Sequence, residues 1–375
     1  MLHDLETPAL VLDEGRMSRN ISRMRSRLDT LGVSFRPHVK TCKSIDVARR
    51  MMSTPAGPIT VSTLKEAEYF LAHGVTDILY AVGVAPNKLS HVLALRARGA
   101  RLTVILDNVD AARAVAAASR DAGQCLEALI EVDSDGHRSG VQPADPLLLA
   151  IAAALESGGA RLAGVMTHAG SSYNCANVDA IRAMAEQERD AVVQSAKQLR
   201  DAGYACPVVS VGSTPTATFA RDLTGVTEVR TGVFVFFDLF MAGLQVCRIE
   251  DIALSVLTSV IGHQRDKGWA IVDAGWMAMS RDRGTAKQAV DQGYGVVCDA
   301  GGKPIPDLIM VDANQEHGII AHRSGDPARL PELPVGTLLR VLPNHACATG
   351  AQHDRYHIVK GNERVTAVWS RFSGW

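Results

Sequence analysis

Closely spaced cysteines are missing from this chain. Its seven cysteines are odd in number and scattered, and none belongs to a Cys-x-x-Cys pair. Zinc ribbons depend on such pairs, and disulfide frameworks usually use an even number of cysteines in a short chain, so we expect reduced thiols and a cytoplasmic protein. Most of these cysteines lie in apolar stretches, where the residue behaves as a small buried side chain. Only Cys42 and Cys347 have neighbours that suggest another role.

Basic runs and long apolar runs are also missing. The 39 Lys and Arg residues and the 40 Asp and Glu residues are interspersed and leave a formal net charge of −1. This balance favours neither nucleic acid nor an anionic membrane as a partner. Acidic residues stand near the N-terminus, where a secretory signal would be basic, and the longest apolar stretch, 146–155, is too short to span a bilayer. We therefore expect a small-molecule substrate.

Strand-like and helix-like segments alternate through the first part of the chain. The first helix has apolar residues that step by three and four over 17–31 and ends at Gly32. Eight strand-like segments follow this rhythm and lie near 33–39, 59–62, 77–82, 102–107, 126–132, 162–167, 207–211 and 226–235. Eight such units predict an α/β fold of the (β/α)8 barrel type, because an open doubly wound sheet usually has fewer strands.

The rhythm changes beyond Phe240. Strand-like segments are now separated by loops rich in Gly, Pro and Asp, and they lie near 252–260, 269–273, 308–312 and 337–342. This pattern predicts a C-terminal antiparallel β domain, which the early strand 8–13 could join. We place the barrel at 14–240 and the β domain at 241–375 together with 1–13.

A lysine stands at the end of the first predicted barrel strand. The stretch 34–43 alternates in polarity and contains Lys40. The C-terminal ends of barrel strands carry the active site, and an amine there can form a Schiff base with a carbonyl compound. A surface lysine whose stem lies along the barrel mouth would give the same pattern. Lys40 is thus a candidate catalytic residue.

Small residues follow the seventh predicted strand, at 212–214, and stand in the second half of the eighth, at 232–233. In a barrel this is the usual place for a phosphate cradle built from backbone N–H groups, although a Gly-Ser-Thr turn is equally an ordinary helix cap. A phosphate on one side of the mouth and Lys40 on the other together favour pyridoxal 5′-phosphate as the ligand. A sugar phosphate would explain the cradle but not the lysine.

A His-x-Cys motif follows a strand of the β domain. On extended backbone His345 and Cys347 would project to the same side, where imidazole and thiolate can share one metal ion and leave coordination positions open for catalysis. The motif is short, so an ordinary structural role explains it as well. Aspartates, Glu316 and His317 are candidates for hydrogen-bonding to these metal ligands and so orienting them.

Taken together, these motifs resemble the fold type III pyridoxal-phosphate enzymes: alanine racemase in architecture, and the D-threonine aldolase and D-serine dehydratase family in detail. The resemblance covers essentially the whole chain. The segments that carry it are 36–41, 61–68, 135–141, 167–173, 209–216, 272–284 and 342–350.

The resemblance implies a role for each matched residue. Lys40 would be the Schiff-base lysine, Arg138 would approach the phenolic oxygen of the cofactor, and Tyr173 would lie near its pyridine nitrogen. The full set implied to bind the cofactor is Lys40, His38, Arg138, His168, Tyr173, Gly212, Ser213, Thr214, Gly232 and Val233. A divalent cation (Mg, Mn, Co, Ni or Zn) would be held by His345 and Cys347. Arg230 stays outside this set, because related enzymes differ at that position.

The implied reaction is β-elimination of a D-3-hydroxy amino acid, most of all D-threo-3-hydroxyaspartate, to oxaloacetate and ammonia. Arg281 and Arg283 could bind a second substrate carboxylate, although solvated surface arginines would give the same pattern. A D-threonine-type aldolase is the main alternative, but aldolases of the family tend to have Asp where Cys347 stands and a histidine shortly after the position of Tyr173. A racemase has no use for His-x-Cys, and a barrel-only cofactor-binding protein lacks the β domain. A homodimer is expected, with the β domain of one subunit closing the barrel mouth of the other.

Overall fold

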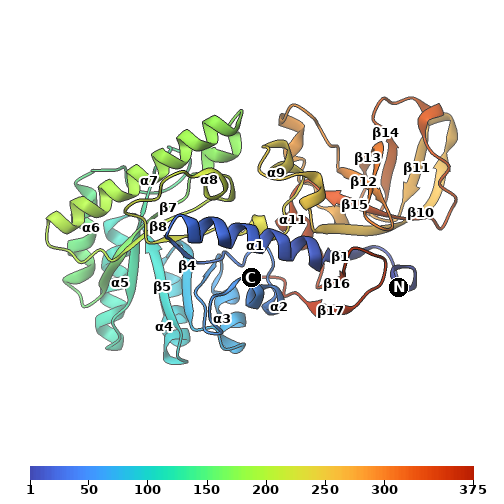
Figure 1. Cartoon of the computed structure of the whole chain (residues 1–375). Helices are drawn as coiled ribbons and strands as arrows, with labels where there is room; N and C mark the ends of the chain where they lie inside the picture. Colours follow the sequence, from blue (N-terminus) through green and yellow to red (C-terminus); the bar gives the residue numbers. More distant parts are fainter. The chain divides into compact units, whose positions relative to one another are not determined.

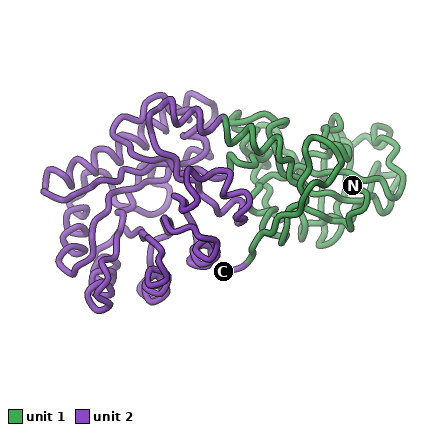
Figure 2. Tube along the Cα trace, turned by 60° about the horizontal axis from the view of Figure 1, so that its bottom comes forward, with its two compact units in different colours: residues 1–22, 233–373 green, residues 23–232, 374–375 purple.

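The computed structural model describes residues 1–375, and it divides into two compact units (Figure 2). Unit 1 comprises residues 1–22 and 233–373, and unit 2 comprises residues 23–232 and 374–375. Each unit contains its own β-sheet, and the chain order of the elements can be followed by colour in Figure 1. None of the helices is both long and apolar enough to cross a membrane.

Unit 2 contains a parallel sheet of eight strands that closes on itself. The strands pair in the order β2-β9-β8-β7-β6-β5-β4-β3. Beyond β2 the backbone of His38 bridges to Thr60 of β3, which joins the two ends of the sheet. The strands are β2 (Ser34–Phe35), β3 (Ile59–Val61), β4 (Asp77–Gly83), β5 (Arg101–Leu106), β6 (Glu127–Val132), β7 (Arg161–Thr167), β8 (Val208–Val211) and β9 (Glu228–Val229). The predicted eight-stranded barrel is therefore confirmed.

Helices connect these strands and, in Figure 1, lie around the outside of the sheet. They are α1 (Glu14–Thr30), α2 (Ile45–Met51), α3 (Leu64–Ala72), α4 (Leu89–Ala97), α5 (Val109–Ala122), α6 (Leu147–Glu156), α7 (Val178–Asp201) and α8 (Thr214–Phe219). Several begin at a side chain that caps the first turn, such as Thr63, Asn108 and Asn177. The side chains of one face of the strands, from Leu79, Ile105, Leu129 and Met166, pack into one apolar cluster.

The eighth strand is shorter than the sequence indicated. A strand over 226–235 was wrong: β9 ends at Val229, and Val233–Val235 form a 3-10 turn. The chain turns because it passes close to the first strand here. A Cβ on Gly232 would lie only 2.7 Å from the carbonyl oxygen of His38. The apolar residues over 233–237 are buried, and because buried strands are also apolar, the sequence pattern predicted a longer strand here.

Unit 1 contains a nine-stranded sheet ordered β11-β14-β13-β12-β15-β10-β1-β16-β17. An additional pairing of β10 with β11 closes six of these strands into an antiparallel barrel. The strands are β1 (Ala9–Asp13), β10 (Leu254–Gln264), β11 (Trp269–Val272), β12 (Gly295–Asp299), β13 (Pro304–Ala313), β14 (Gly318–His322), β15 (Leu338–Pro343), β16 (Arg355–Val359) and β17 (Ala367–Ser370). The predicted antiparallel β domain is thereby confirmed.

The first strand of the chain belongs to this second sheet. β1 pairs antiparallel with β10 and parallel with β16. Residues from all three strands form one buried apolar cluster that includes Val11, Leu257 and Val359. Three short helices complete the unit: α9 (Leu239–Gly243), α10 (Trp276–Met279) and α11 (Ala346–Gly350).

Candidate active site

Lys40 lies just beyond the point where the eight-stranded sheet closes. The backbone N–H of His38 donates to Thr231 (2.9 Å), and that of Val39 donates to Thr60 (2.9 Å). These two bonds tie the segment to the strands on either side. The Lys40 side chain is exposed in this unit, so its amine is accessible at the C-terminal end of the strands.

His38 presents a buried polar atom without a partner. Its Nδ1 has no hydrogen bond, while its Nε2 lies 3.4 Å from the Ser62 hydroxyl. Burial, together with the nearby charge of Lys40, lowers the pKa of His38 well below 6.5. The imidazole is therefore neutral. A buried orphaned nitrogen is costly and is usually explained by a missing ligand or water.

His168 follows β7 and is held by the turn after β8. Its Nδ1–H donates to the carbonyl oxygen of Gly212 at 2.5 Å. Burial lowers the pKa of His168 to about 3, although the bond to Gly212 opposes this shift. His168 is thus a neutral imidazole with its proton on Nδ1. The ring of Tyr173 lies 6.2 Å from that of His168, centroid to centroid.

Hydroxyl groups gather at the start of α8. Ser213 caps this helix, and its Oγ is 2.9 Å from the Oγ of Ser172. The hydroxyls of Thr214 and Thr231 lie 2.5 Å apart. All four side chains are buried. Gly212 adopts φ +154°, and a Cβ there would collide with the backbone of Arg230. The turn can therefore form only with glycine at this position.

Arg138 lies in the loop after β6 and forms an ion pair with Glu131. Its Nη2 is 3.7 Å from a Glu131 oxygen, and Ser139 Oγ donates to the other oxygen at 3.1 Å. Burial raises the pKa of Glu131, opposed by the bond from Ser139. The Glu131 side chain is 7 % exposed, whereas that of Arg138 is 62 % exposed. The guanidinium therefore remains open to an oxygen ligand.

Arg230, by contrast, is occupied by the protein itself. Its Nε donates to Ser210 Oγ at 2.8 Å, and its Nη2 donates to the carbonyl oxygen of Thr167. The side chain is buried, and burial lowers its pKa despite the charge of Glu228.

His345 has extended backbone, but Cys347 lies in a helix, so the expectation that both residues stand on extended backbone was wrong. His345 is the N-cap of α11, and Cys347 lies within that helix. The side chains of His345 and Cys347 still interact, because β15 ends just before them and α11 begins directly after His345. Burial lowers the pKa of His345, but the charge of Cys347 and a hydrogen bond to Asp282 raise it to about 11.

Two aspartates hold this turn. Asp282 Oδ2 lies 2.6 Å from His345 Nδ1. Asp238 is buried and accepts from the backbone N–H groups of Ala346 (2.9 Å) and Met241 (3.0 Å). In many metal sites a carboxylate binds one ring nitrogen of a histidine in this way and leaves the other nitrogen for the metal, which would displace the proton there. Glu316 and His317, considered for this support, are exposed in the turn between β13 and β14.

The residues present suit both expected groups. For pyridoxal phosphate they offer an accessible lysine amine, the unpartnered His38 Nδ1 and two glycines with no room for a Cβ. For a divalent cation they offer an imidazole and a thiol, donors typical of Zn and neighbouring metals. No cluster of three or more His, Cys, Asp or Glu side chains is arranged around a metal position. A cation bound here would have two protein ligands and open positions.

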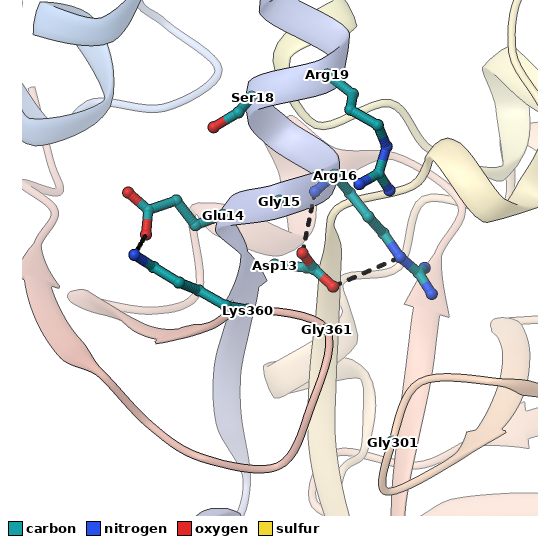
Figure 3. Close-up of a pocket in the computed structure, with 9 residues that line it drawn as sticks. All are labelled: Asp13, Glu14, Gly15, Arg16, Ser18, Arg19, Gly301, Lys360 and Gly361. Atoms are coloured by element: carbon teal, nitrogen blue, oxygen red, sulfur yellow. Dashed lines mark hydrogen bonds and ion pairs between the residues drawn. The ribbon is translucent and has the colours of Figure 1, made fainter.

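A separate pocket of about 550 Å³ lies at the start of α1 (Figure 3). Four of its charged groups pair with one another: Lys360 with Glu14 at 3.2 Å, and Arg16 with Asp13 at 3.6 Å. None of the residues predicted for the cofactor or metal lines it. We therefore do not assign the active site to this pocket.

Sequence reasoning missed several residues of these sites. Glu188 lies within α7 and contacts the turns after β7 and β8, but its spacing is that of any amphipathic helix. Asp282 precedes its partner His345 by 63 residues, so only the folded chain connects them. Asp238 could have been noticed as a helix cap, since it directly precedes α9.

Comparisons with known proteins agree with this arrangement. Residues 12–239 match the family described as alanine racemase, N-terminal domain, and residues 253–359 match the putative serine dehydratase domain. The chain is 58% identical to D-threo-3-hydroxyaspartate dehydratase of Delftia sp. (strain HT23), over 99% of this chain and 98% of that protein. It is 28% identical to D-serine dehydratase of Dictyostelium discoideum, over 97% of this chain and 96% of that protein.

Solved structures give the same result. The structure of D-threo-3-hydroxyaspartate dehydratase from Delftia sp. HT23 matches with a TM-score of 0.96, at 58% identity, over 100% of this chain and 99% of that chain. A cysteine-to-alanine variant of such a dehydratase, solved in the metal-free form, also matches with a TM-score of 0.96, at 57% identity and the same coverage. The chain therefore belongs to the family of pyridoxal-phosphate-dependent enzymes of alanine racemase fold that includes the D-serine dehydratases, and it is a lyase of that family.

Proposed function

We propose that the chain converts D-threo-3-hydroxyaspartate to oxaloacetate and ammonia. The observation that carries this proposal is the 58% identity, over 99% of the chain, to a dehydratase named for that substrate. Loss of water from the α and β carbons leaves an enamine, and its hydrolysis takes up water again and releases ammonia. The net reaction thus needs no oxidant or second substrate.

The cofactor would be held by residues of unit 2. We assign covalent attachment to Lys40, contact with the phenolic oxygen to Arg138, and contact near the pyridine nitrogen to Tyr173. We assign the phosphate to the glycine-rich turns, at Gly212, Ser213, Thr214, Gly232 and Val233. His38 and His168 complete the set, and both are supported as uncharged hydrogen-bonding groups by the lowered pKa of each imidazole.

Lys40 would also perform proton transfer. When bound, pyridoxal phosphate withdraws electrons from the α-carbon of an attached amino acid and so acidifies the α-proton. The free Lys40 amine would be the base that takes this proton. Its exposed position after β2 supports the assignment, because an accessible amine can reach the substrate.

His345 and Cys347 would bind a divalent cation. Hydroxide is a poor leaving group, and a cation at this position would stabilise the negative charge on the departing oxygen. Asp282 would orient His345 by accepting a hydrogen bond from its Nδ1–H, which leaves Nε2 as the nitrogen for the cation. The metal-free form of a close relative supports a metal in that relative, and we extend this to His345 and Cys347 here.

Arg281 is our candidate for the second carboxylate of the substrate. Arg281 and Arg283 both flank Asp282, but Arg283 pairs with Asp291 at 2.7 Å. Arg281 stacks over the Trp276 ring at 5.2 Å and is exposed. A guanidinium in this position can bind a carboxylate through two hydrogen bonds.

We also propose a cytoplasmic homodimer, with functional domains at 14–240 and at 241–375 plus 1–13. These proposals rest on the family resemblance and on the absence of disulfide spacings. Light scattering after size-exclusion chromatography measures the mass of the assembly, and 80 kDa, twice the 40.0 kDa of one chain, is expected.

Product analysis tests the proposed reaction. Purified protein is given D-threo-3-hydroxyaspartate, D-serine and D-threonine in parallel, and oxo acid, ammonia, glycine and aldehyde are each assayed. Fastest release of oxaloacetate and ammonia from D-threo-3-hydroxyaspartate is expected. Faster release of glycine and an aldehyde from D-threonine would instead establish an aldolase, an activity named for relatives at 27–29% identity.

A further inference from the structure

Glu188 connects two neighbouring turns at the C-terminal ends of the barrel strands. It lies on the buried face of α7 and is 2% exposed. One of its oxygens, Oε1, accepts from the backbone N–H of Ala169 at 3.0 Å and from that of Gly212 at 3.0 Å. Ala169 follows β7, and Gly212 follows β8. A single carboxylate from the outer helix thereby fixes the spacing of two turns.

Both turns carry residues of the proposed cofactor site. His168 directly precedes Ala169 and donates its Nδ1–H to the Gly212 carbonyl. Gly212 directly precedes the Ser213 and Thr214 turn. Removing the Glu188 carboxylate would leave two buried N–H groups unpaired, and both turns would be free to move.

The surroundings of Glu188 combine burial with several hydrogen-bond donors. Burial raises its pKa, but hydrogen bonds from the Thr216 side chain and from the two backbone groups, together with the Arg230 charge, oppose this shift. An uncharged apolar residue would fit the buried face of α7 more simply. A buried carboxylate at this position is explained if the positions of the turns after β7 and β8 matter for function.

We propose that Glu188 is a positioning residue of the cofactor site. It touches neither cofactor nor substrate; it holds the turn after β8 where the phosphate is bound and orients His168 through Gly212. The inference rests on the proposed phosphate site at 212–214. Its specific consequence is that loss of Glu188 weakens binding of the phosphate part of the cofactor more than binding of the rest.

The test compares two ligands that differ only in the phosphate. Full-length protein freed of cofactor is titrated with pyridoxal 5′-phosphate and with pyridoxal, and the dissociation constants are measured by absorbance. The variants are Glu188→Ala, Glu188→Gln and, as a matched control, Glu186→Ala, which removes an exposed carboxylate from the same helix.

In Glu188→Ala, affinity for pyridoxal 5′-phosphate should fall at least tenfold, while affinity for pyridoxal changes less than threefold. Glu188→Gln should largely restore the difference, because the amide oxygen can accept the same two bonds. Glu186→Ala should match wild type. If Glu188→Ala does not fold, Glu188→Asp replaces it under the same criterion, since its shorter side chain cannot reach both N–H groups.

Two outcomes overturn the inference and are distinguishable. Equal weakening of both ligands in Glu188→Ala would mean that Glu188 supports the fold in general, and the proposed cofactor site would stand. If the wild-type protein binds pyridoxal as tightly as pyridoxal 5′-phosphate, the proposed phosphate site is wrong, and so is the proposed role of Glu188.

Discussion

Replacing Arg36 by Met should destabilise the protein strongly. Arg36 lies at the N-terminal side of the barrel interior, where its Nε pairs with Glu228 at 2.8 Å and its Nη1 pairs with Asp77 at 2.7 Å. Glu228 in turn accepts from Ser210, which accepts from Arg230 near the proposed cofactor site. The chain of contacts thus runs through the barrel, and Arg36 supplies the positive charge at one end.

The expected cost follows from burial. The side chains of Arg36 and Glu228 are 15% and 10% exposed, so Arg36→Met leaves a nearly buried carboxylate without its main partner. Removing one member of such a pair typically costs about 3–5 kcal/mol. Asp77 contributes less, because it is 31% exposed and keeps Arg101 at 3.4 Å. We expect a loss of about 3 kcal/mol or more in the free energy of unfolding.

Urea denaturation measures this loss, with Lys197→Met as the control. Lys197 pairs with Asp201 on the surface of α7, where the side chains are 72% and 62% exposed. That variant should lose less than about 1 kcal/mol. Adding Glu228→Gln to Arg36→Met should recover part of the loss, because the orphaned charge disappears. A loss in Arg36→Met as small as in the control would refute the reasoning.

Three further outcomes are expected. Borohydride reduction of the holoenzyme should fix the cofactor on Lys40; peptide mapping to Lys43 or Lys65 would contradict the strand assignment. Chelation should abolish oxo acid release and leave the cofactor spectrum intact, whereas loss of that spectrum would indicate a structural metal. The free energy of unfolding should fall as pH decreases from about 6.5 towards 3, by up to roughly 1.4 kcal/mol per pH unit from His168. In this range His168 binds a proton in the unfolded chain but stays neutral in the folded protein, where its pKa is about 3. In His168→Gln, urea denaturation at several pH values should show a shallower fall, and an unchanged slope would exclude His168 as its source.

The barrel was predictable because its signals are local. Alternating strands and helices, a glycine shortly after most helices and polar residues at strand ends all occur within a few positions of one another. The strand before Lys40 was predicted over 33–39 but comprises only Ser34–Phe35, so Lys40 lies in a turn beyond the strand end and not at it. β9 was predicted too long because the buried apolar residues after Gly232 have the composition of a strand, while the turn there is imposed by the distant His38 backbone.

Long-range partners were not predictable in the same way. Nothing near Glu188 in sequence indicates that its carboxylate meets Ala169 and Gly212, because those contacts exist only once the strands are side by side. Likewise, Asp282 reaches His345 through the packing of unit 1. His345 caps the helix α11, so the chain turns into a helix directly after it, and the residues up to Cys347 do not continue the extended backbone that was predicted.

The most direct test of the proposed division of labour uses Cys347→Ala in deuterium oxide. Lys40 remains in place in this variant, so solvent deuterium should still enter the α-position of D-threo-3-hydroxyaspartate. Release of oxaloacetate should fall far more than this exchange, because in the proposed function only departure of the hydroxyl needs the cation that we assign to His345 and Cys347. Cys125→Ala, which changes an exposed cysteine of unit 2, should retain both activities. Equal loss of exchange and elimination in Cys347→Ala, or undiminished elimination, would contradict the account.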